Sequence, residues 1–201
     1  AVTGPFDGIS RIESDTIKST SGQNAISLNM FDGRRIVFGD ESGVPKLVDL
    51  KSLTVKKPLS PFHNFSEDWV HAVSALGSSY YACTCSGVRV LDPDFRETAC
   101  FDFQDMRSLN IVTFNGGKYI IGSGIGNIRM FNTAGTRLLD INICSFREIK
   151  NRQDQTLPFV DLRGGRIIAV TRSGKVLVFS VSMAGGRITA SHPEIVQMPM
   201  P

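Results

Sequence analysis

The chain has 201 residues, of which 41% are hydrophobic and 20% are charged, the composition of an ordinary globular protein. Its formal net charge of +3 is too small for a dedicated nucleic-acid binder, which carries a clustered basic face. No apolar run reaches the ~18 residues of a membrane-spanning helix, and the first residues do not have the pattern of a secretory signal.

The first 24 residues fit no complete repeat of the pattern described next. We expect either an N-terminal extension or the outer strand of a preceding blade, which residues 8–15 would form.

Four later segments, residues 33–49, 77–92, 116–132 and 164–180, repeat one pattern. Glycine or a glycine-containing turn opens each copy, a β-branched or aromatic run follows, and a turn with serine or glycine leads to a second apolar run that ends at a polar residue. Repeats of about 40 to 50 residues built only from short strands are typical of β-propellers. The sequence therefore predicts an all-β protein.

We expect each repeat to be one blade of four antiparallel strands, with an apolar inner part and a more polar outer strand. The predicted blades cover about residues 25–60, 68–103, 108–143 and 157–193. The outer strand of the last blade is placed at residues 187–191. A long loop with at most one helical turn is expected over residues 144–154, and a proline- and methionine-containing tail at residues 198–201.

The four cysteines, Cys83, Cys85, Cys100 and Cys144, form no CxxC pair and have no histidine at metal-ligand spacing. We expect buried free thiols in a reducing compartment, which predicts an intracellular protein, cytoplasmic or nuclear, without a bound metal.

The repeats resemble those of the WD40-type β-propeller. The Trp-Asp pair of that family is replaced by Val48-Asp49, Leu91-Asp92, Phe131-Asn132 and Phe179-Ser180, and the Gly-His pair is absent. The resemblance covers residues 25 to 193 and implies that the side-chain tetrad bracing a standard blade is missing. Propellers use about four to eight blades. The chain is thus part of a larger propeller, a half-ring completed by another polypeptide, or a closed four-bladed ring like hemopexin-like domains; an incomplete ring is favoured.

The sequence offers no catalytic constellation. The histidines His63, His71 and His192 are scattered over the chain, and nucleophile-elbow, P-loop and metalloprotease motifs are absent. The glycine-rich stretch 122–127 lies between two predicted strands, so we expect a hairpin turn there. A dinucleotide-binding glycine motif would instead be followed by a helix. We therefore expect no enzyme activity and no cofactor.

Aromatic and basic residues gather instead on the loops that would share one face of the propeller. Residues of these types are enriched at protein interfaces. The candidate partner-binding residues are Phe62, His63, Phe65, Trp69, Arg107, Arg147, Lys150, Arg152 and Arg172, with Met106 beside them.

The sequence therefore predicts a non-catalytic scaffold for protein–protein interaction, a propeller subunit or segment of a larger complex. Its protein partners would complete or cap the open propeller edges. The alternative is an RNA-associated propeller subunit of a ribonucleoprotein, in which the basic loops contact phosphates.

Overall fold

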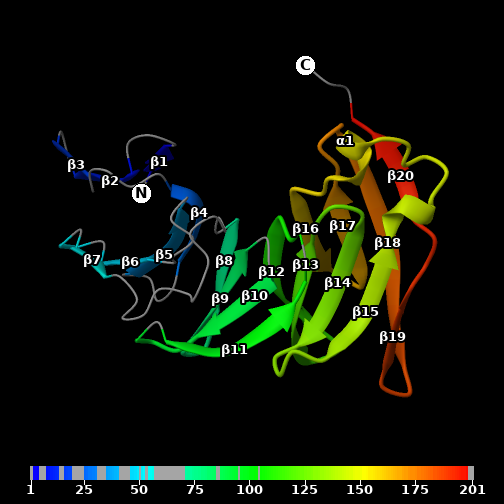
Figure 1. Cartoon of the computed structure of the whole chain (residues 1–201), viewed down its shortest axis with the longest axis horizontal. Coiled ribbons are helices and arrows are strands. Elements are labelled where there is room, and N and C mark those ends of the chain that lie inside the picture. The colour runs from blue at the N-terminus through cyan, green and yellow to red at the C-terminus, as the bar shows by residue number, and fades with distance from the viewer. Residues whose placement is uncertain are drawn as a thin grey trace. The chain divides into compact units, whose positions relative to one another are not determined.

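The structure is a computed structural model of the chain. It describes the following residues: 2–4, 8–13, 16–19, 25–30, 35–40, 46–49, 51–52, 54–56, 71–84, 87–94, 96–103 and 105–198. The chain divides into two compact units, Ala1–Phe103 and Gln104–Pro201, and each is described here by itself (Figure 1).

Unit 1 holds a three-stranded sheet and two four-stranded sheets, all antiparallel between neighbours. The three-stranded sheet comprises β1 (Val2–Gly4), β2 (Gly8–Glu13) and β3 (Thr16–Ser19). Sheet 1 comprises β4 (Ala25–Met30), β5 (Arg35–Asp40), β6 (Lys46–Asp49) and β7 (Thr54–Lys56). Sheet 2 comprises β8 (Ala72–Leu76), β9 (Ser79–Thr84), β10 (Gly87–Leu91) and β11 (Glu97–Asp102).

The N-terminal residues contain more strand than the sequence indicated. The predicted outer strand corresponds to β2, which pairs on one side with β1 and on the other with β3. The sequence did not predict this three-stranded sheet, because its strands are only 3 to 6 residues long and lack the glycine pattern of the four repeats.

Unit 2 holds two further antiparallel sheets (Figure 1). Sheet 3 comprises β12 (Ser108–Phe114), β13 (Gly117–Ser123), β14 (Asn127–Asn132) and β15 (Arg137–Asn142). Sheet 4 comprises β16 (Phe159–Arg163), β17 (Arg166–Val170), β18 (Lys175–Ala184), β19 (Arg187–Ala190) and β20 (Glu194–Gln197). The glycine-rich stretch 122–127 is the hairpin between β13 and β14, as predicted.

One turn recurs in sheets 1, 2 and 3 where the third strand meets the fourth, and it explains the polar residue that ends the first three repeats. The Asn132 Oδ1 atom accepts hydrogen bonds from the backbone N–H groups of Ala134 (3.1 Å) and Thr136 (2.8 Å). Asp92 in sheet 2 accepts from the corresponding N–H groups of Asp94 and Arg96, and Asp49 in sheet 1 accepts from those of Lys51 and Ser52. Aspartate and asparagine are suited to this turn because their short side chains reach the backbone two residues ahead.

Sheet 4 lacks this turn, and its outer part differs from the prediction. Ser180 stands at the position of Asn132, and β18 continues through it to Ala184 before turning at Gly185 and Gly186, which have φ values of 55° and 78°. The predicted outer strand at residues 187–191 corresponds to β19, but it pairs only with the last part of β18. β20, which the sequence reading missed, pairs with the first part, opposite Lys175–Val178.

Sheets 3 and 4 share one hydrophobic core. Ile121, Ile128 and Met130 of sheet 3 belong to the same buried cluster as Ile167 and Phe179 of sheet 4. A hydrogen bond also joins the two sheets: the side-chain amide of Asn110 donates to the Val160 carbonyl oxygen at 2.7 Å. Unit 2 is therefore two face-packed sheets with a continuous interior.

The cysteine prediction is correct for burial at Cys83 only. Cys83 is buried, but Cys100 and Cys144 are exposed, and all three are free thiols. Cys100 lies on the outermost strand of sheet 2, where most side chains face solvent, and Cys144 lies in a short helical turn. Cys85 is outside the described residues.

Within the described residues, no helix is both long and apolar enough to cross a membrane. The same residues contain no cluster of three or more His, Cys, Asp or Glu side chains able to hold a metal ion.

Candidate interaction surfaces

The structure describes five of the nine candidate residues. Arg107 is half-buried just before β12, and its backbone N–H donates to the Ser123 carbonyl oxygen at 2.7 Å. Arg147, Lys150, Arg152 and Arg172 are exposed in unit 2. The remaining candidates, Phe62, His63, Phe65 and Trp69, lie outside the described residues, while Met106 is fully buried and belongs to the interior.

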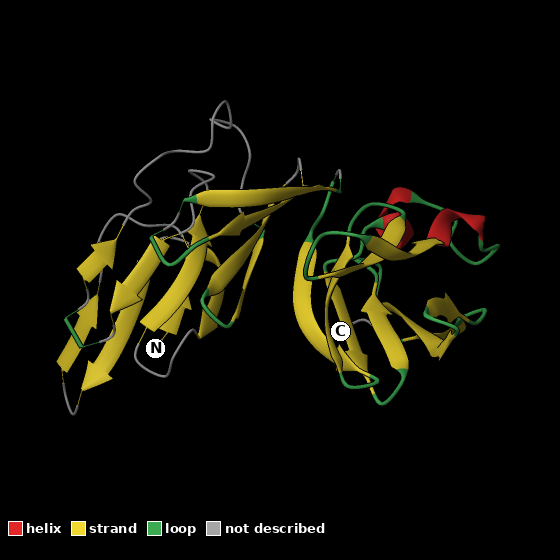
Figure 2. Ribbon diagram, turned by 90° about the horizontal axis from the view of Figure 1, so that it is seen from below, coloured by secondary structure: helices red, strands yellow, loops and turns green. Residues whose placement is uncertain are grey.

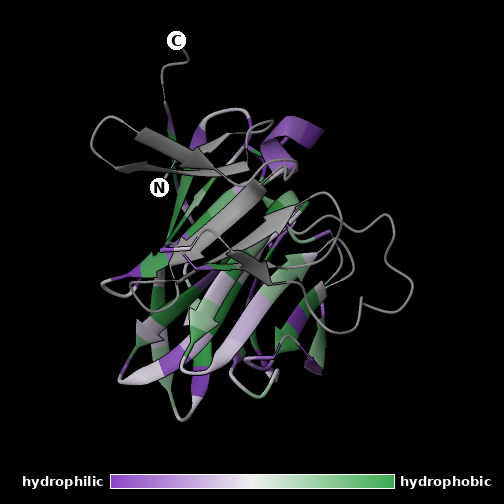
Figure 3. Ribbon diagram, turned by 90° about the vertical axis from the view of Figure 1, so that its left-hand side faces the viewer, coloured by the Kyte–Doolittle hydropathy of each residue, from purple (hydrophilic) through white to green (hydrophobic). Residues whose placement is uncertain are grey.

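Three of the exposed cations lie on the connector between β15 and β16, residues 143–158. The connector contains the 3-10 turn η1 (Ile143–Ser145) and the single helical turn α1 (Arg152–Gln155), drawn in red in Figure 2. Asn142 and Asn151 cap the two turns by accepting backbone N–H groups. The α1 turn is hydrophilic (Figure 3), and the expectation of a long loop with one helical turn agrees with this arrangement apart from η1.

Asp154 fastens the connector to the turn between β17 and β18. Its Oδ1 atom accepts a hydrogen bond from the Ser173 hydroxyl at 2.5 Å, and its Oδ2 atom accepts from the Lys175 ammonium at 2.8 Å and the Lys150 backbone N–H at 3.1 Å. The side chain is almost fully buried, with 3% of the residue exposed. We call Asp154, Thr171, Ser173 and Lys175 the Asp154 network, because the Thr171 and Ser173 hydroxyls are also hydrogen-bonded to each other.

The Asp154 network keeps this carboxyl ionised. Burial alone would raise the pKa of Asp154, but the hydrogen bonds from Lys175, Ser173 and Lys150 outweigh it and lower the pKa from 3.8 to about 2. The network joins a connector side chain to a strand turn within one sheet, so it braces sheet 4. No sequence motif predicts the Asp154 network, because its residues are separated in the chain and belong to types that occur throughout it.

Four cations near this network have no acidic partner among the described residues. The connector and the β17–β18 turn, residues 143–158 and 171–174, contain two acidic residues, of which Asp154 is paired with Lys175. Among the described residues, Arg147, Lys150, Arg152 and Arg172 form no ion pair. We call these four residues the basic loop group.

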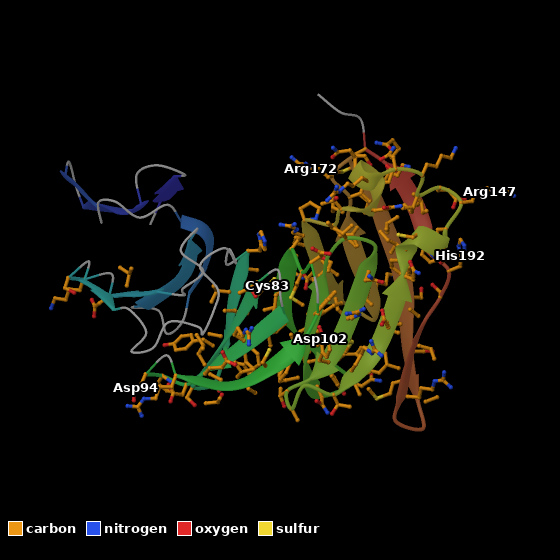
Figure 4. The ribbon with its side chains drawn as sticks, viewed as in Figure 1. Cys83, Asp94, Asp102, Arg147, Arg172 and His192 are labelled. Carbon is orange, nitrogen blue, oxygen red and sulfur yellow. The ribbon has the colours of Figure 1, made fainter. Side chains whose placement is uncertain are left out.

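The basic loop group is spread along one end of unit 2 rather than gathered in one site. Arg172 lies beside the α1 turn, because its backbone N–H donates to the Thr156 carbonyl oxygen at 2.8 Å. Arg147 lies at the other part of the connector, next to Phe146, whose ring packs edge-on against His192 with 5.0 Å between the ring centroids. Figure 4 labels Arg147, Arg172 and His192. The backbone bond between Arg172 and Thr156 brings the β17–β18 turn next to the connector, and a partner-binding role for these residues stays a prediction.

A second surface is the face of sheet 4 that points away from sheet 3. Cross-strand pairing aligns Phe159, Val170, Val176 and Val196 in one row across β16, β17, β18 and β20. The next row contains Asp161, Ile168, Val178 and Glu194, and the third contains Arg163, Arg166 and Ser180. We call these three rows the outer face of sheet 4.

The first row of the outer face is apolar and partly exposed to solvent, and the other two rows mix apolar with charged and polar residues. Phe159 is 43% exposed and Val196 is 57% exposed, whereas their alternating neighbours Val160, Leu177 and Phe179 are buried against sheet 3. Ile168, Val170, Val176 and Val178 are partly exposed and lie outside the shared core. The sequence predicted open propeller edges but did not identify these residues, because a continuous apolar run does not tell which side of a sheet has a neighbour.

Three solved structures are similar to this fold. BamB from Moraxella catarrhalis aligns with a TM-score of 0.59 and 16% identity over 87% of this chain and 54% of its own. The β-propeller domain of Cps50 (Swd1) from Myceliophteria thermophila aligns with a TM-score of 0.59 and 12% identity over 92% of this chain and 61% of its own. The computationally designed Ika4 protein aligns with a TM-score of 0.57 and 12% identity over 80% of this chain and 93% of its own.

The chain therefore spans 54% of the BamB chain and 61% of the Swd1 propeller domain that it matches. No family model matches the sequence, and no curated protein matches it. BamB and Swd1 are β-propellers, and the four antiparallel sheets follow one another along the chain as blades do. The chain is built of β-propeller blades, as its glycine-punctuated repeats predicted.

Proposed function

We propose that this chain is a non-catalytic scaffold for protein–protein interaction and works as a subunit or segment of a larger complex. The observation that carries the proposal is the open outer face of sheet 4. A propeller blade normally packs both faces against neighbours. A partner that covers the outer face would give it the second neighbour.

The chemistry of the outer face supports binding rather than solvation. Phe159, Val170, Val176 and Val196 form an unbroken apolar row across four strands. Burying one such side chain fully is worth about 2 kcal/mol, so the row offers several kcal/mol of driving force for association. Contiguous exposed apolar patches of this kind mark interaction sites.

The proposal is tested by purifying the tagged chain from its own cells and washing at low and high salt. We expect a stoichiometric protein partner that stays bound at high salt, because apolar docking is not screened. The double variant Phe159→Ser/Val196→Arg should lose that partner, whereas Ala184→Arg, at an exposed position at the end of β18, should keep it. A soluble monomer that purifies without any partner would contradict the proposal.

RNA association is the second candidate, and the basic loop group favours it. Cations without ion pairs are free to meet phosphates, and binding to RNA through Arg147, Lys150, Arg152 and Arg172 should weaken steeply as salt rises. The matched comparison is Arg152→Glu/Arg172→Glu against Lys118→Glu/Arg187→Glu, which changes the net charge equally at exposed sites outside the connector and the β17–β18 turn. Salt-sensitive RNA binding that only the first pair abolishes would establish this function; equal loss in both pairs would show nonspecific attraction.

A further inference from the structure

The hairpin between β12 and β13 turns at Asn115 and Gly116, where the chain has its single asparagine–glycine pair. Phe114 pairs with Gly117, so Asn115 and Gly116 form a loop of two residues. Their φ values are 46° and 78°, and a two-residue hairpin loop with both φ values positive favours asparagine followed by glycine. Both residues are exposed to solvent.

An asparagine–glycine pair can react with itself. The backbone nitrogen that follows the asparagine attacks the side-chain Cγ atom, and a bond forms between them. The bond from Cγ to Nδ2 breaks, and ammonia leaves with the proton of the attacking nitrogen. Water then opens the resulting succinimide at one of its two carbonyl groups, which gives either aspartate or isoaspartate. Glycine is the most permissive residue for this step because it has no Cβ to crowd its nitrogen.

The attacked side chain is unrestrained at Asn115. Residues 105–198 contain six asparagines, and only the side chain of Asn115 forms no hydrogen bond with the described residues. The other five side chains are hydrogen-bonded to backbone groups, namely those of Asn110, Asn127, Asn132, Asn142 and Asn151. Such a bond must break before the side chain can move to the attacking nitrogen, which slows the reaction about fivefold.

The attacking nitrogen is also accessible. The Gly116 N–H forms no hydrogen bond with the described residues, whereas the N–H of Gly135, in the next hairpin of sheet 3, donates to the Asn132 carbonyl oxygen at 3.0 Å. A Cβ atom placed on Gly116 would meet nothing within 4 Å, so no neighbouring group shields this turn.

We infer that Asn115 is a site of spontaneous deamidation, in which water is the co-reactant and aspartate and isoaspartate are the products. Isoaspartate carries the main chain through its Cβ atom and so lengthens a loop that the pairing of Phe114 with Gly117 holds at two residues. Phe114 belongs to the core shared by sheets 3 and 4. Isoaspartate at position 115 therefore loosens the β12–β13 hairpin. The inference is independent of the proposed scaffold function.

The test incubates the folded full chain in warm, slightly alkaline buffer and follows its peptides by mass spectrometry. Deamidation replaces NH2 by OH and raises the mass, and chromatography separates the aspartate and isoaspartate peptides. We expect position 115 to change at least about fivefold faster than each of the five hydrogen-bonded asparagines, and to yield both products. Amide hydrogen exchange in β12 and β13 should become faster in the isoaspartate form.

Asn115→Gly is the matched control. Sheet 4 already makes two-residue loops from two glycines, Gly164–Gly165 and Gly185–Gly186, and all four have positive φ values. The variant therefore keeps the hairpin and should lose the early mass gain, while the five other asparagines react at their original rates. Asn115→Asp introduces the charge without the longer main chain, so its hydrogen exchange separates the two effects.

Two results would overturn the inference. One is a hydrogen-bonded asparagine, such as Asn132, that changes as fast as Asn115 in the folded chain. The other is an Asn115 that stays intact in the folded chain during the time in which it converts in the chain unfolded by urea, because the hairpin would then protect it. The comparison among asparagines uses the wild-type chain and holds whether or not a variant folds.

Discussion

At the scale of single residues, Asp154 is the most consequential side chain that the structure describes. It is nearly fully buried, it accepts three hydrogen bonds, and it ties the connector that carries Arg147, Lys150 and Arg152 to the β17–β18 turn. Removing one partner of such a buried pair leaves the other charge poorly compensated.

We expect Asp154→Ala to lower the free energy of unfolding by about 3 kcal/mol, because Lys175 loses its carboxylate in a site where it is mostly enclosed. The control is Asp140→Ala, which removes a more exposed carboxylate that pairs with Arg129 and Arg137 and should cost less than about 1 kcal/mol. Urea unfolding of the three proteins measures both values. Equal costs would show that burial of the Asp154 network adds nothing.

The lowered pKa of Asp154 also predicts a pH dependence. The folded pKa is about 2, below the ordinary value of 3.8, so this group contributes its full stabilisation above 3.8 and loses it as the pH falls through about 2. The difference corresponds to about 2 kcal/mol. In unfolding measurements between about pH 5 and pH 2, the wild-type chain should lose stability more steeply than Asp154→Asn. Parallel curves would contradict the assignment.

At the scale of elements, the aspartate or asparagine that ends the third strand decides where a blade turns. Asn132, Asp92 and Asp49 each accept two backbone N–H groups, and the fourth strand begins a few residues later. Ser180 takes this place in sheet 4, where the strand runs on and a longer hairpin forms. Sheet 4 therefore has serine instead of aspartate or asparagine at this position, and its outer part is divided between β19 and β20.

We expect Asn132→Ala to destabilise unit 2 by about 1 kcal/mol, since two backbone donors lose their acceptor. Asn132→Asp should retain most of the stability because the Oδ1 acceptor remains. Thr133→Ala, an exposed change in the same turn, serves as the control. Amide hydrogen exchange at Thr136 reports the turn directly, and unchanged protection there in Asn132→Ala would disprove its role.

At the scale of the whole molecule, the glycine-punctuated repeats predicted four antiparallel sheets of the propeller type, and this prediction is confirmed. Local chemistry suffices for it: glycine permits the hairpin turns, β-branched and aromatic residues favour the strands, and the Asp or Asn turn closes the third hairpin. These preferences act between residues that lie within about ten positions of one another, so strands and turns can be predicted from the sequence.

The sequence predicted the candidate surfaces less completely than it predicted the strands. The loop order of a propeller led us to expect Lys150, Arg152 and Arg172 on one face, which stays a prediction, and the Asp154 network beside them was not predicted. The sequence predicted open propeller edges without identifying the residues of the outer face of sheet 4, and it missed β20. Each depends on contacts between residues that are distant in the chain, such as Asp154 with Lys175 or Val176 with Val196.

The sequence by itself predicted most strands of the four glycine-punctuated repeats and the hairpins between them, because backbone conformation and turn chemistry are local properties, but it did not predict β1, β3 and β20. Only the tertiary structure decided which apolar residues are buried and which are exposed. Phe159 and Phe179 both lie on strands rich in apolar residues, yet Phe179 meets sheet 3 and Phe159 meets solvent. Whether a side chain is buried depends on which element packs against that face of the sheet, and the residues of the strand itself do not specify that element.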